Sequence, residues 1–147
     1  MNIRLVAKVV LVREGKVLLM RRGMTDKRRP GQWDLPGGAV DEDEDINSAA
    51  ARETQEEAGI TVDPLKLNLV FTEKAVTDAG FTMWLFFAEK AATDQVVISH
   101  EHSEYRWVIP AEAREMIEYP LHKALFAHLA ENEILEELGL LPRLQEA

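Results

Sequence analysis

The sequence GGAVDEDEDINSAAARETQEEAGI, residues 37–60, decides the fold and the chemistry of this chain. It opens on a glycine pair, runs through five acidic residues at positions 41–45, and closes with a predicted helix. Glu53, Glu56 and Glu57 share one face of that helix, because residues three and four positions apart lie above one another. Like charges at this spacing destabilise a helix by about 0.2–0.5 kcal/mol per pair. Their grouping makes physical sense around a hard divalent cation such as Mg²⁺ or Mn²⁺, which prefers oxygen ligands.

An acidic helix by itself is most often a solvated face, because glutamate is a good helix former. The full spacing of the stretch carries much more information than the three glutamates. Its fixed positions are Gly38, Glu44, Arg52, Glu53, Glu56, Glu57, Gly59 and Ile60. At average residue frequencies, such a string arises by chance at roughly one starting position in 10⁹.

This spacing resembles the signature box of the Nudix hydrolases, which cleave nucleoside diphosphates linked to another moiety. The resemblance covers about 23 residues directly, and a Trp-x-Leu-Pro-Gly-Gly run at residues 33–38 extends it upstream. Thr54 departs from the pattern, since the family usually has an aliphatic residue there, at a position that should face the core. The resemblance implies an α/β/α sandwich with a mixed sheet, in which the box forms a loop–helix–loop.

The resemblance also implies roles for individual residues. Glu53, Glu56 and Glu57 are expected to hold Mg²⁺ or Mn²⁺, with the carbonyl of Gly37 as a further ligand. Glu44 and Arg52 are expected to form an ion pair that orients the loop and the helix, and Arg52 is counted with the catalytic set.

A further carboxylate is expected from the segment before a late strand. The run Glu-His-x-x-Tyr-Arg-Trp looks most like that of the diadenosine polyphosphate hydrolases, which makes Glu101 the first choice and Glu104 the second. The general base remains open among the box glutamates and Glu101. Candidate substrate-binding residues are Arg22, Trp33 and Gly38.

Composition sets the outer limits. The chain has 147 residues, a net charge of −9 and no cysteine, which predicts one domain over residues 1–147 without disulfides, in the cytoplasm. So acidic a chain is a poor match for sequence-independent nucleic-acid binding. No apolar run approaches the roughly 18 residues of a membrane span.

The remaining sequence predicts strands first, then a helix, then strands and helices, which indicates an α+β fold. The predicted strands are residues 3–12, 17–20, 65–71, 81–88, 96–99 and 105–108. A turn is expected at residues 77–80. Residues 41–45 are expected to form the first turn of the box helix. Residues 110–118 and 121–138 are predicted helices, split by Pro120.

Several polar residues have two interpretations. The loop at residues 23–34 could be a lid over the site, but Lys27, Arg28 and Arg29 fit an ordinary solvated loop better. Trp33 fits base stacking and core packing equally. The His-x-His pattern of His100 and His102 is typical of surface polarity rather than of zinc. His122 and His128 are expected to be surface or packing residues.

Substrate choice is set outside the box in the resembling family. Residues 74–77 offer neither the proline of the ADP-sugar branch nor the tyrosine of the diadenosine branch, so a nucleoside triphosphate or similar nucleotide is the default. A nucleotide-sensing or partner-binding module without turnover is the alternative. A structural acidic protein with an accidental motif is a third class, which the spacing disfavours. A homodimer is expected from family habit alone.

Overall fold

A single mixed sheet forms the middle of the computed structural model, which describes residues 3–77 and 80–141. Within these residues the sheet has seven strands, in the order β3-β2-β1-β6-β5, with β4 paired to β1 and β7 to β2. The strands are β1 (Ile3–Arg13), β2 (Lys16–Arg22), β3 (Trp33–Asp34), β4 (Gly37–Ala39), β5 (Asn68–Thr77), β6 (Gly80–Lys90) and β7 (His102–Val108). The helices are α1 (Ile46–Ala58), α2 (Pro110–Met116), α3 (Pro120–Glu131) and α4 (Ile134–Glu137), with a 3₁₀ turn η1 (Pro64–Lys66).

Strand β1 is the centre of the sheet. It turns back into β2 through Glu14 and Gly15, whose φ angles of 50° and 76° match the tight hairpin turn expected at this position. It also pairs with β6 in parallel over ten residues, and β6 pairs with β5 antiparallel. The sheet is therefore mixed, as predicted.

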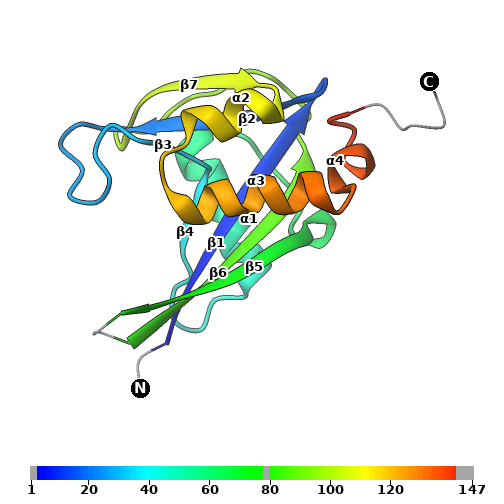
Figure 1. Ribbon diagram of the computed structural model, residues 1–147. Helices are drawn as coiled ribbons and strands as arrows, with labels where there is room; N and C mark the ends of the chain where they lie inside the picture. Colours follow the sequence, from blue (N-terminus) through cyan, green and yellow to red (C-terminus); the bar gives the residue numbers. More distant parts are fainter. Residues whose placement is uncertain (1–2, 78–79, 142–147) are drawn as a thin grey trace.

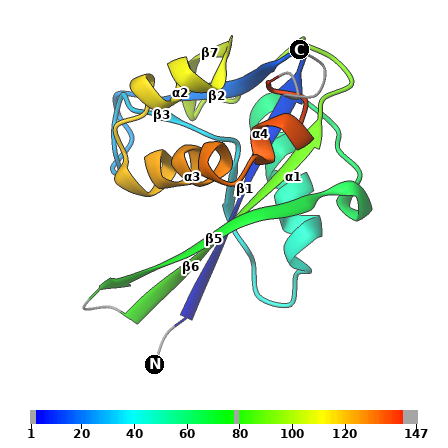
Figure 2. The ribbon, with the colours of Figure 1, turned by 45° about the vertical axis from the view of Figure 1, so that its right-hand side comes forward.

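Helices cover both faces of the sheet (Figures 1 and 2). Alternate residues of β1 point to opposite faces, so Val10 and Val12 join one core cluster and Val9 and Leu11 join the other. The first cluster includes apolar side chains of α2, α3 and α4, and the second includes Ala50 and Ala58 of α1. This arrangement confirms the predicted α+β sandwich.

The box helix begins one residue after the acidic run. Asp45 has extended backbone angles and its carboxylate accepts from the Ser48 amide at 3.1 Å, which makes it the N-cap. The helix ends at Gly59, where φ is 69° and the amide donates to the Gln55 carbonyl at 3.0 Å. The prediction that residues 41–45 form the first helical turn is wrong, because the side chain of Asp45 caps the helix from outside it.

The segment at residues 96–99 is not a strand, although its apolar residues predicted one. Its amides bond to the end of α1: Val97 donates to the Ala58 carbonyl at 2.9 Å, and Ser99 donates to the Glu57 carbonyl at 3.1 Å. These bonds satisfy carbonyls that the helix leaves without partners. The segment thereby fixes the helix end that carries Glu57.

Three other boundaries differ from the predictions. Residues 64–66 form the turn η1, and Leu65 is 94% exposed, so the alternating strand predicted from residue 65 begins only at Asn68. Pro120 does not merely split two helices but opens α3, where it needs no amide partner. The last predicted helix stops at Glu131 and resumes as α4 after Glu133, whose φ is 60°. The predicted turn at residues 77–80 falls largely outside the described residues.

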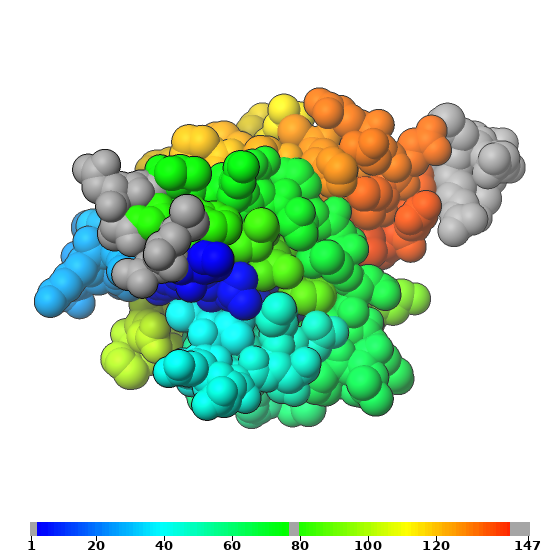
Figure 3. Space-filling view, turned by 90° about the horizontal axis from the view of Figure 1, so that it is seen from below, coloured from blue at the N-terminus to red at the C-terminus, as the bar shows by residue number. Residues whose placement is uncertain are grey.

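Seen from below, the start of β1 lies between α1 and the β5–β6 hairpin (Figure 3). The loop after β2 projects beside the segment that precedes β7, and the Gly23 amide donates to the Glu101 carbonyl at 3.0 Å. In the ranges 3–77 and 80–141, no helix is long and apolar enough to span a membrane.

Candidate active site

One pocket of about 750 Å³ gathers charged residues of both signs. Five carboxylates line it, three from α1, one from the segment before β7 and one from the loop after β2: Glu53, Glu56, Glu57, Glu101 and Asp26. Five cationic side chains also line it: Arg4, Lys8, Arg22, Arg28 and Arg29. Three aromatic rings complete it: Phe81, Trp84 and Tyr119. The pocket therefore offers separate surfaces to a cation, to anionic groups and to a ring.

The glycine pair leaves room for this arrangement. A Cβ on Gly38 would lie 3.0 Å from the carboxyl carbon of Glu53, so the missing side chain is space that the carboxylate uses. Gly37 has φ 129°, and a Cβ there would lie 2.1 Å from the Ala7 carbonyl oxygen, so only glycine fits. The Gly37 carbonyl, expected as a metal ligand, accepts from Lys8 Nζ at 3.1 Å.

Arg52 is the centre of a surface cluster of acids. Its Nε and Nη2 donate to the two oxygens of Glu44 at 2.7 and 2.9 Å, which is the ion pair that the resemblance implied. Its Nη1 lies 3.2 Å from carboxylate oxygens of Glu53 and Glu56. The hydrogen bond to Glu44 is the main cause that raises the pKa of Arg52 above its usual range. Arg52 is not among the residues that line the pocket, so it contacts the site through these carboxylates.

Glu57 is the most buried of the box glutamates, at 4% exposure. Burial raises its pKa to about 9, with a further contribution from Glu53 and against the opposing charge of Lys8. In the metal-free protein its carboxyl group therefore keeps a proton at neutral pH.

His102 lies beside Glu57 and not on the surface, which corrects the interpretation from the sequence. Its Nε2 lies 3.7 Å from Glu57 Oε1, too far for a hydrogen bond, and the residue is buried. Burial and the charge of Lys8 lower the pKa of His102, so the ring is neutral at pH 7.

The two candidate late carboxylates differ in position. Glu101 lines the pocket, and its backbone carbonyl is tied to Gly23 across the mouth. Glu104 is not a lining residue, and it pairs instead with Arg21 at 3.8 Å and with Arg106 at 3.5 Å. The geometry thus favours Glu101, the first choice.

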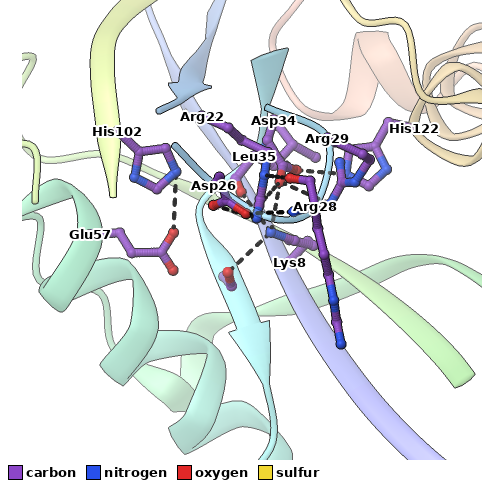
Figure 4. A network of polar contacts seen from close by, with 11 residues as sticks. Lys8, Arg22, Asp26, Arg28, Arg29, Asp34, Leu35, Glu57, His102 and His122 are labelled. Carbon is purple, nitrogen blue, oxygen red and sulfur yellow. Dashed lines mark hydrogen bonds and ion pairs between the residues drawn. The ribbon is translucent and has the colours of Figure 1, made fainter. Parts of the chain in front are cut away.

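Asp34 is the centre of a second cluster, which is buried (Figure 4). Its Oδ2 accepts from three cations: Arg22 at 3.0 Å, Lys8 at 3.2 Å and Arg29 at 3.3 Å. Its Oδ1 accepts from the Leu35 amide and from His122 Nε2, both at 2.7 Å. The side chain is fully buried, so this carboxylate holds the basic wall of the pocket in place from behind.

The protonation states in this cluster follow from its charges. Burial alone would raise the pKa of Asp34, but Lys8, the hydrogen bond from His122 and Arg29 hold it well below its usual value. Burial lowers the pKa of His122 more than Asp34 raises it, so His122 is neutral and donates to an ionised carboxylate. His122 also packs edge-on against Trp84 and Tyr119, with ring centroids 5.6 and 5.2 Å away.

The acidic wall fits a divalent cation by its donor chemistry, though not by its present side-chain positions. Within the described residues, no three His, Asp or Glu side chains converge closely enough to hold an ion. Glu53 and Glu56 are instead paired with Arg52. The available donors are carboxylate oxygens, and the space beside Gly38 is open to them, which suits Mg²⁺ or Mn²⁺.

The sequence of this chain matches a known protein family. The model of the NUDIX domain matches residues 2–129. The chain belongs to the NUDIX domain family. The box glutamates, the glycine pair and the Glu44–Arg52 ion pair all lie within the matched residues.

The relatives of this chain are named for different nucleotide substrates. The nucleoside triphosphatase NudI of Escherichia coli is 30% identical over 135 residues, 84% of this chain and 92% of the relative. The asymmetrical bis(5'-nucleosyl)-tetraphosphatase of Caenorhabditis elegans is 35% identical over 95 residues, 61% of this chain and 67% of the relative. A Mycobacterium tuberculosis protein, provisionally named 8-oxo-dGTP diphosphatase 3, is 32% identical over 114 residues, 76% of this chain. The match spans only 51% of that relative's length.

Solved NUDIX structures agree with the fold. A MutT protein from Methanosarcina mazei superposes with a TM-score of 0.79 at 27% identity, covering 90% of this chain and 96% of its own. A C. elegans Ap4A hydrolase complex gives a TM-score of 0.70 at 26% identity, covering 89% and 98%.

Two interpretations of the basic loop need correction against this NUDIX structure. Arg29 is not solvated: its side chain is 18% exposed and pairs with the buried Asp34. Arg28 is exposed, yet it also lines the pocket. Trp33 does not line the pocket but packs against the core near α2 and α3, with the Arg106 guanidinium 5.4 Å from its ring.

Sequence reasoning missed Lys8, Asp34, Trp84 and Tyr119. One signal was present for Lys8, which interrupts the apolar run at residues 5–12 and would be costly to bury without a partner. Asp34 carried no such signal, because an acidic residue beside a loop is normally solvated. Thr54 does face the core as predicted, and its hydroxyl donates to the Ala50 carbonyl at 2.8 Å.

Proposed function

We propose that this chain is a metal-dependent pyrophosphohydrolase that cleaves a nucleoside diphosphate linked to another moiety by water attack on phosphorus. The observation that carries this proposal is the pocket with carboxylates on one wall and cationic side chains on the other. A nucleoside triphosphate is the default substrate, in keeping with the triphosphatase name of the E. coli relative. We further propose that residues 1–147 form one domain, because both core clusters share a single sheet.

The chain's own residues divide the work. Glu53, Glu56 and Glu57 would hold Mg²⁺ or Mn²⁺, which when bound neutralises phosphate oxygens and acidifies water. Arg22 would bind phosphate oxygens directly, because its guanidinium is fixed by Asp34 and Asp26 at the edge of the pocket. Gly38 would let the substrate approach the backbone.

The proton acceptor is a carboxylate in this proposal. Glu57 and Glu101 are both in the pocket, and the geometry leaves the choice between them open. Burial raises the pKa of Glu57 to about 9, so Glu57 would accept a proton only after losing its own, which a divalent cation held beside it would favour. Glu101 lines the same pocket with an exposed side chain.

The test is release of phosphate or pyrophosphate from a panel of nucleotides with Mg²⁺, Mn²⁺ or chelator. The panel holds nucleoside triphosphates, 8-oxo-dGTP, ADP-ribose, nucleotide sugars and diadenosine polyphosphates. We expect metal-dependent turnover that falls by about 10³-fold or more in Glu57→Gln, because a ligand and charge are lost at the reacting centre. Glu115→Gln, on the exposed face of α2, is the matched control and should retain full activity.

One result of the same assay would contradict the proposed hydrolase. Nucleotide binding without turnover on any member of the panel would favour a sensing or partner-binding module. The ion pairs that keep Glu53 and Glu56 on Arg52 are the observation on the side of that alternative.

A further inference from the structure

Arg29 is held more rigidly than an arginine in a surface loop normally is. Its Nη2 lies 3.3 Å from Asp34 Oδ2, and its guanidinium carbon lies 4.4 Å from the centroid of the Tyr119 ring. Its backbone has φ 52°, a left-handed conformation that residues with a side chain rarely adopt. Such strain persists only where the surroundings fix it, and it is concentrated at functional sites.

One nitrogen of this fixed guanidinium has nothing to bind. Arg29 Nη1 is buried and has no hydrogen-bond partner among the described residues. Arg22 shows the contrast, because its Nε, Nη1 and Nη2 all donate, to the Arg28 carbonyl, Asp34 and Asp26. A buried donor on a charged group is costly to leave unpaired. An acceptor supplied by a ligand would remove that cost.

Arg29 lies at the aromatic end of the pocket. Figure 4 shows Arg29 and His122 on one side of the polar network and Glu57 with His102 on the other, with Lys8 between them. The ring beneath Arg29 is that of Tyr119, which lines the pocket together with Trp84. If phosphates lie at the glutamate end, the group that reaches Arg29 is the base.

This inference rests on the function proposed above. We propose that Arg29 is a specificity-determining residue that donates from Nη1 to a carbonyl oxygen of the nucleobase, so that 6-oxopurine nucleotides are preferred over adenine nucleotides. Guanine and hypoxanthine present two acceptors, O6 and N7, on one edge, whereas adenine presents N7 beside an amino donor. An amino group facing the guanidinium would leave two donors without acceptors, which a buried polar site rejects strongly.

Inosine and adenosine triphosphates are the cleanest pair of probes, because their bases differ at the C6 substituent and in the N1 proton that goes with it. The experiment measures kcat/KM for both in the wild type, Arg29→Gln, Arg29→Lys and Arg28→Gln. We expect the wild type to prefer the inosine substrate by about tenfold or more. Arg29→Gln should reduce that preference to about onefold.

Two further variants separate recognition from folding and from charge. Arg29→Lys keeps a cation beside Asp34 but lacks the planar fork, so it should fold and still lose the preference. Arg28→Gln removes the same charge from the neighbouring exposed position, and its preference should equal that of the wild type. Equal loss in Arg28→Gln, or a uniform fall for both substrates in Arg29→Lys, would overturn the proposal, because Arg29 would then act on phosphate or on the overall field.

Failure of this inference and failure of the proposed function give different results. An active enzyme that hydrolyses both triphosphates equally overturns the inference alone. If neither is hydrolysed, quenching of tryptophan fluorescence by inosine and adenosine diphosphates decides, since Trp84 lines the pocket. Selective binding of the inosine compound that is lost in Arg29→Lys supports the inference, whereas equal or absent binding overturns it.

Discussion

Two clusters of charged residues flank the pocket. One has a cation at its centre with acids around it, and the other has an anion at its centre with cations around it. Arg52 is one cation among the acids Asp41, Glu44, Glu53 and Glu56, on a partly exposed surface. Asp34 is one anion among the cations Lys8, Arg22 and Arg29, fully buried. Each cluster carries an excess of charge that one central residue cannot balance. The acidic cluster is suited to gain a cation, and the basic cluster to gain an anionic ligand.

The two clusters also differ in what holds them. Water screens the pairs around Arg52, so geometry there depends on weak forces and can change when a ligand arrives. Around Asp34, the cost of burying charge means that every partner must stay in place. The difference implies a rigid basic wall and an adaptable acidic wall, and four predictions test it.

The largest expected effect is on stability in Asp34→Asn. Removing the central anion leaves buried cations without a partner, so we expect the free energy of unfolding to fall by about 3 kcal/mol. Chemical denaturation measures it. Asp26→Asn is the control, because Asp26 pairs with the same Arg22 at the pocket edge and its loss should cost about 1 kcal/mol or less. Equal falls in the free energy of unfolding for Asp34→Asn and Asp26→Asn would contradict the central role of Asp34 in the buried cluster.

The next largest effect is an increase in stability, expected in Glu57→Gln. Because burial raises the pKa of Glu57 from 4.5 to about 9, its contribution to stability is fully present below pH 4.5 and is lost as the pH rises toward 9. Glu57→Gln should therefore stabilise the chelator-treated protein at pH 7 by about 2 kcal/mol. Thermal unfolding at pH 7 and pH 4 checks this, since the gain should disappear at the lower pH. A destabilised variant at pH 7 would mean that the carboxylate is ionised and paired.

A pH effect should follow from the two buried histidines. Burial lowers the pKa of both His102 and His122 below 6.5, so the unfolded chain takes up protons there that the folded chain does not. The contribution of the two histidines to stability should therefore be present above pH 6.5 and fall by about 1 kcal/mol between pH 7 and pH 5.5, against the opposite change that Glu57 makes over the same range. Urea denaturation of wild type and His122→Gln measures it. An unchanged slope in the variant would show that His122 makes no contribution.

The smallest expected effect is on stability when Arg52, the central residue of the acidic cluster, is replaced. Arg52→Gln removes a cation from a partly exposed cluster, and we expect a stability change within about 1 kcal/mol. The comparison with Asp34→Asn at the same ionic strength is the direct measure of how differently the clusters are held. High salt should reduce the Arg52 effect further. A cost as large as that of Asp34→Asn would remove the distinction.

The acidic wall could be predicted from sequence because it is local. Glu53, Glu56 and Glu57 lie within about one turn of a helix, so helical spacing alone brings them together. The ion pair between Glu44 and Arg52 was implied by the family resemblance instead. The limits of α1 were harder, since a run of acids resembles a first turn and only the Asp45 side chain shows otherwise. The segment at residues 96–99 was misassigned because its apolar residues suit a strand, whereas its amides bond to the end of a helix.

The basic wall could not be predicted because its members are distant in sequence. Lys8 and Asp34 are 26 residues apart, and Asp34 and His122 are 88 apart. No period or motif links such positions, so only the fold shows that His122 reaches a loop carboxylate. Arg29 was assigned to solvent for the same reason: its partners Asp34 and Tyr119 lie on different elements.

The parallel pairing of β1 with β6 has a consequence for how the chain folds. Its register joins Ile3 to Phe81 and Val12 to Lys90, so the central strand finds its longest partner only after nearly eighty intervening residues. Contacts so distant in sequence slow folding, because a large loop must close before they form. During synthesis, the apolar residues of β1 leave the ribosome well before β6 exists. Until β6 is made, β1 can pair only with β2 and β4 among the described strands, so the edge of β1 that β6 later covers is left open to aggregation.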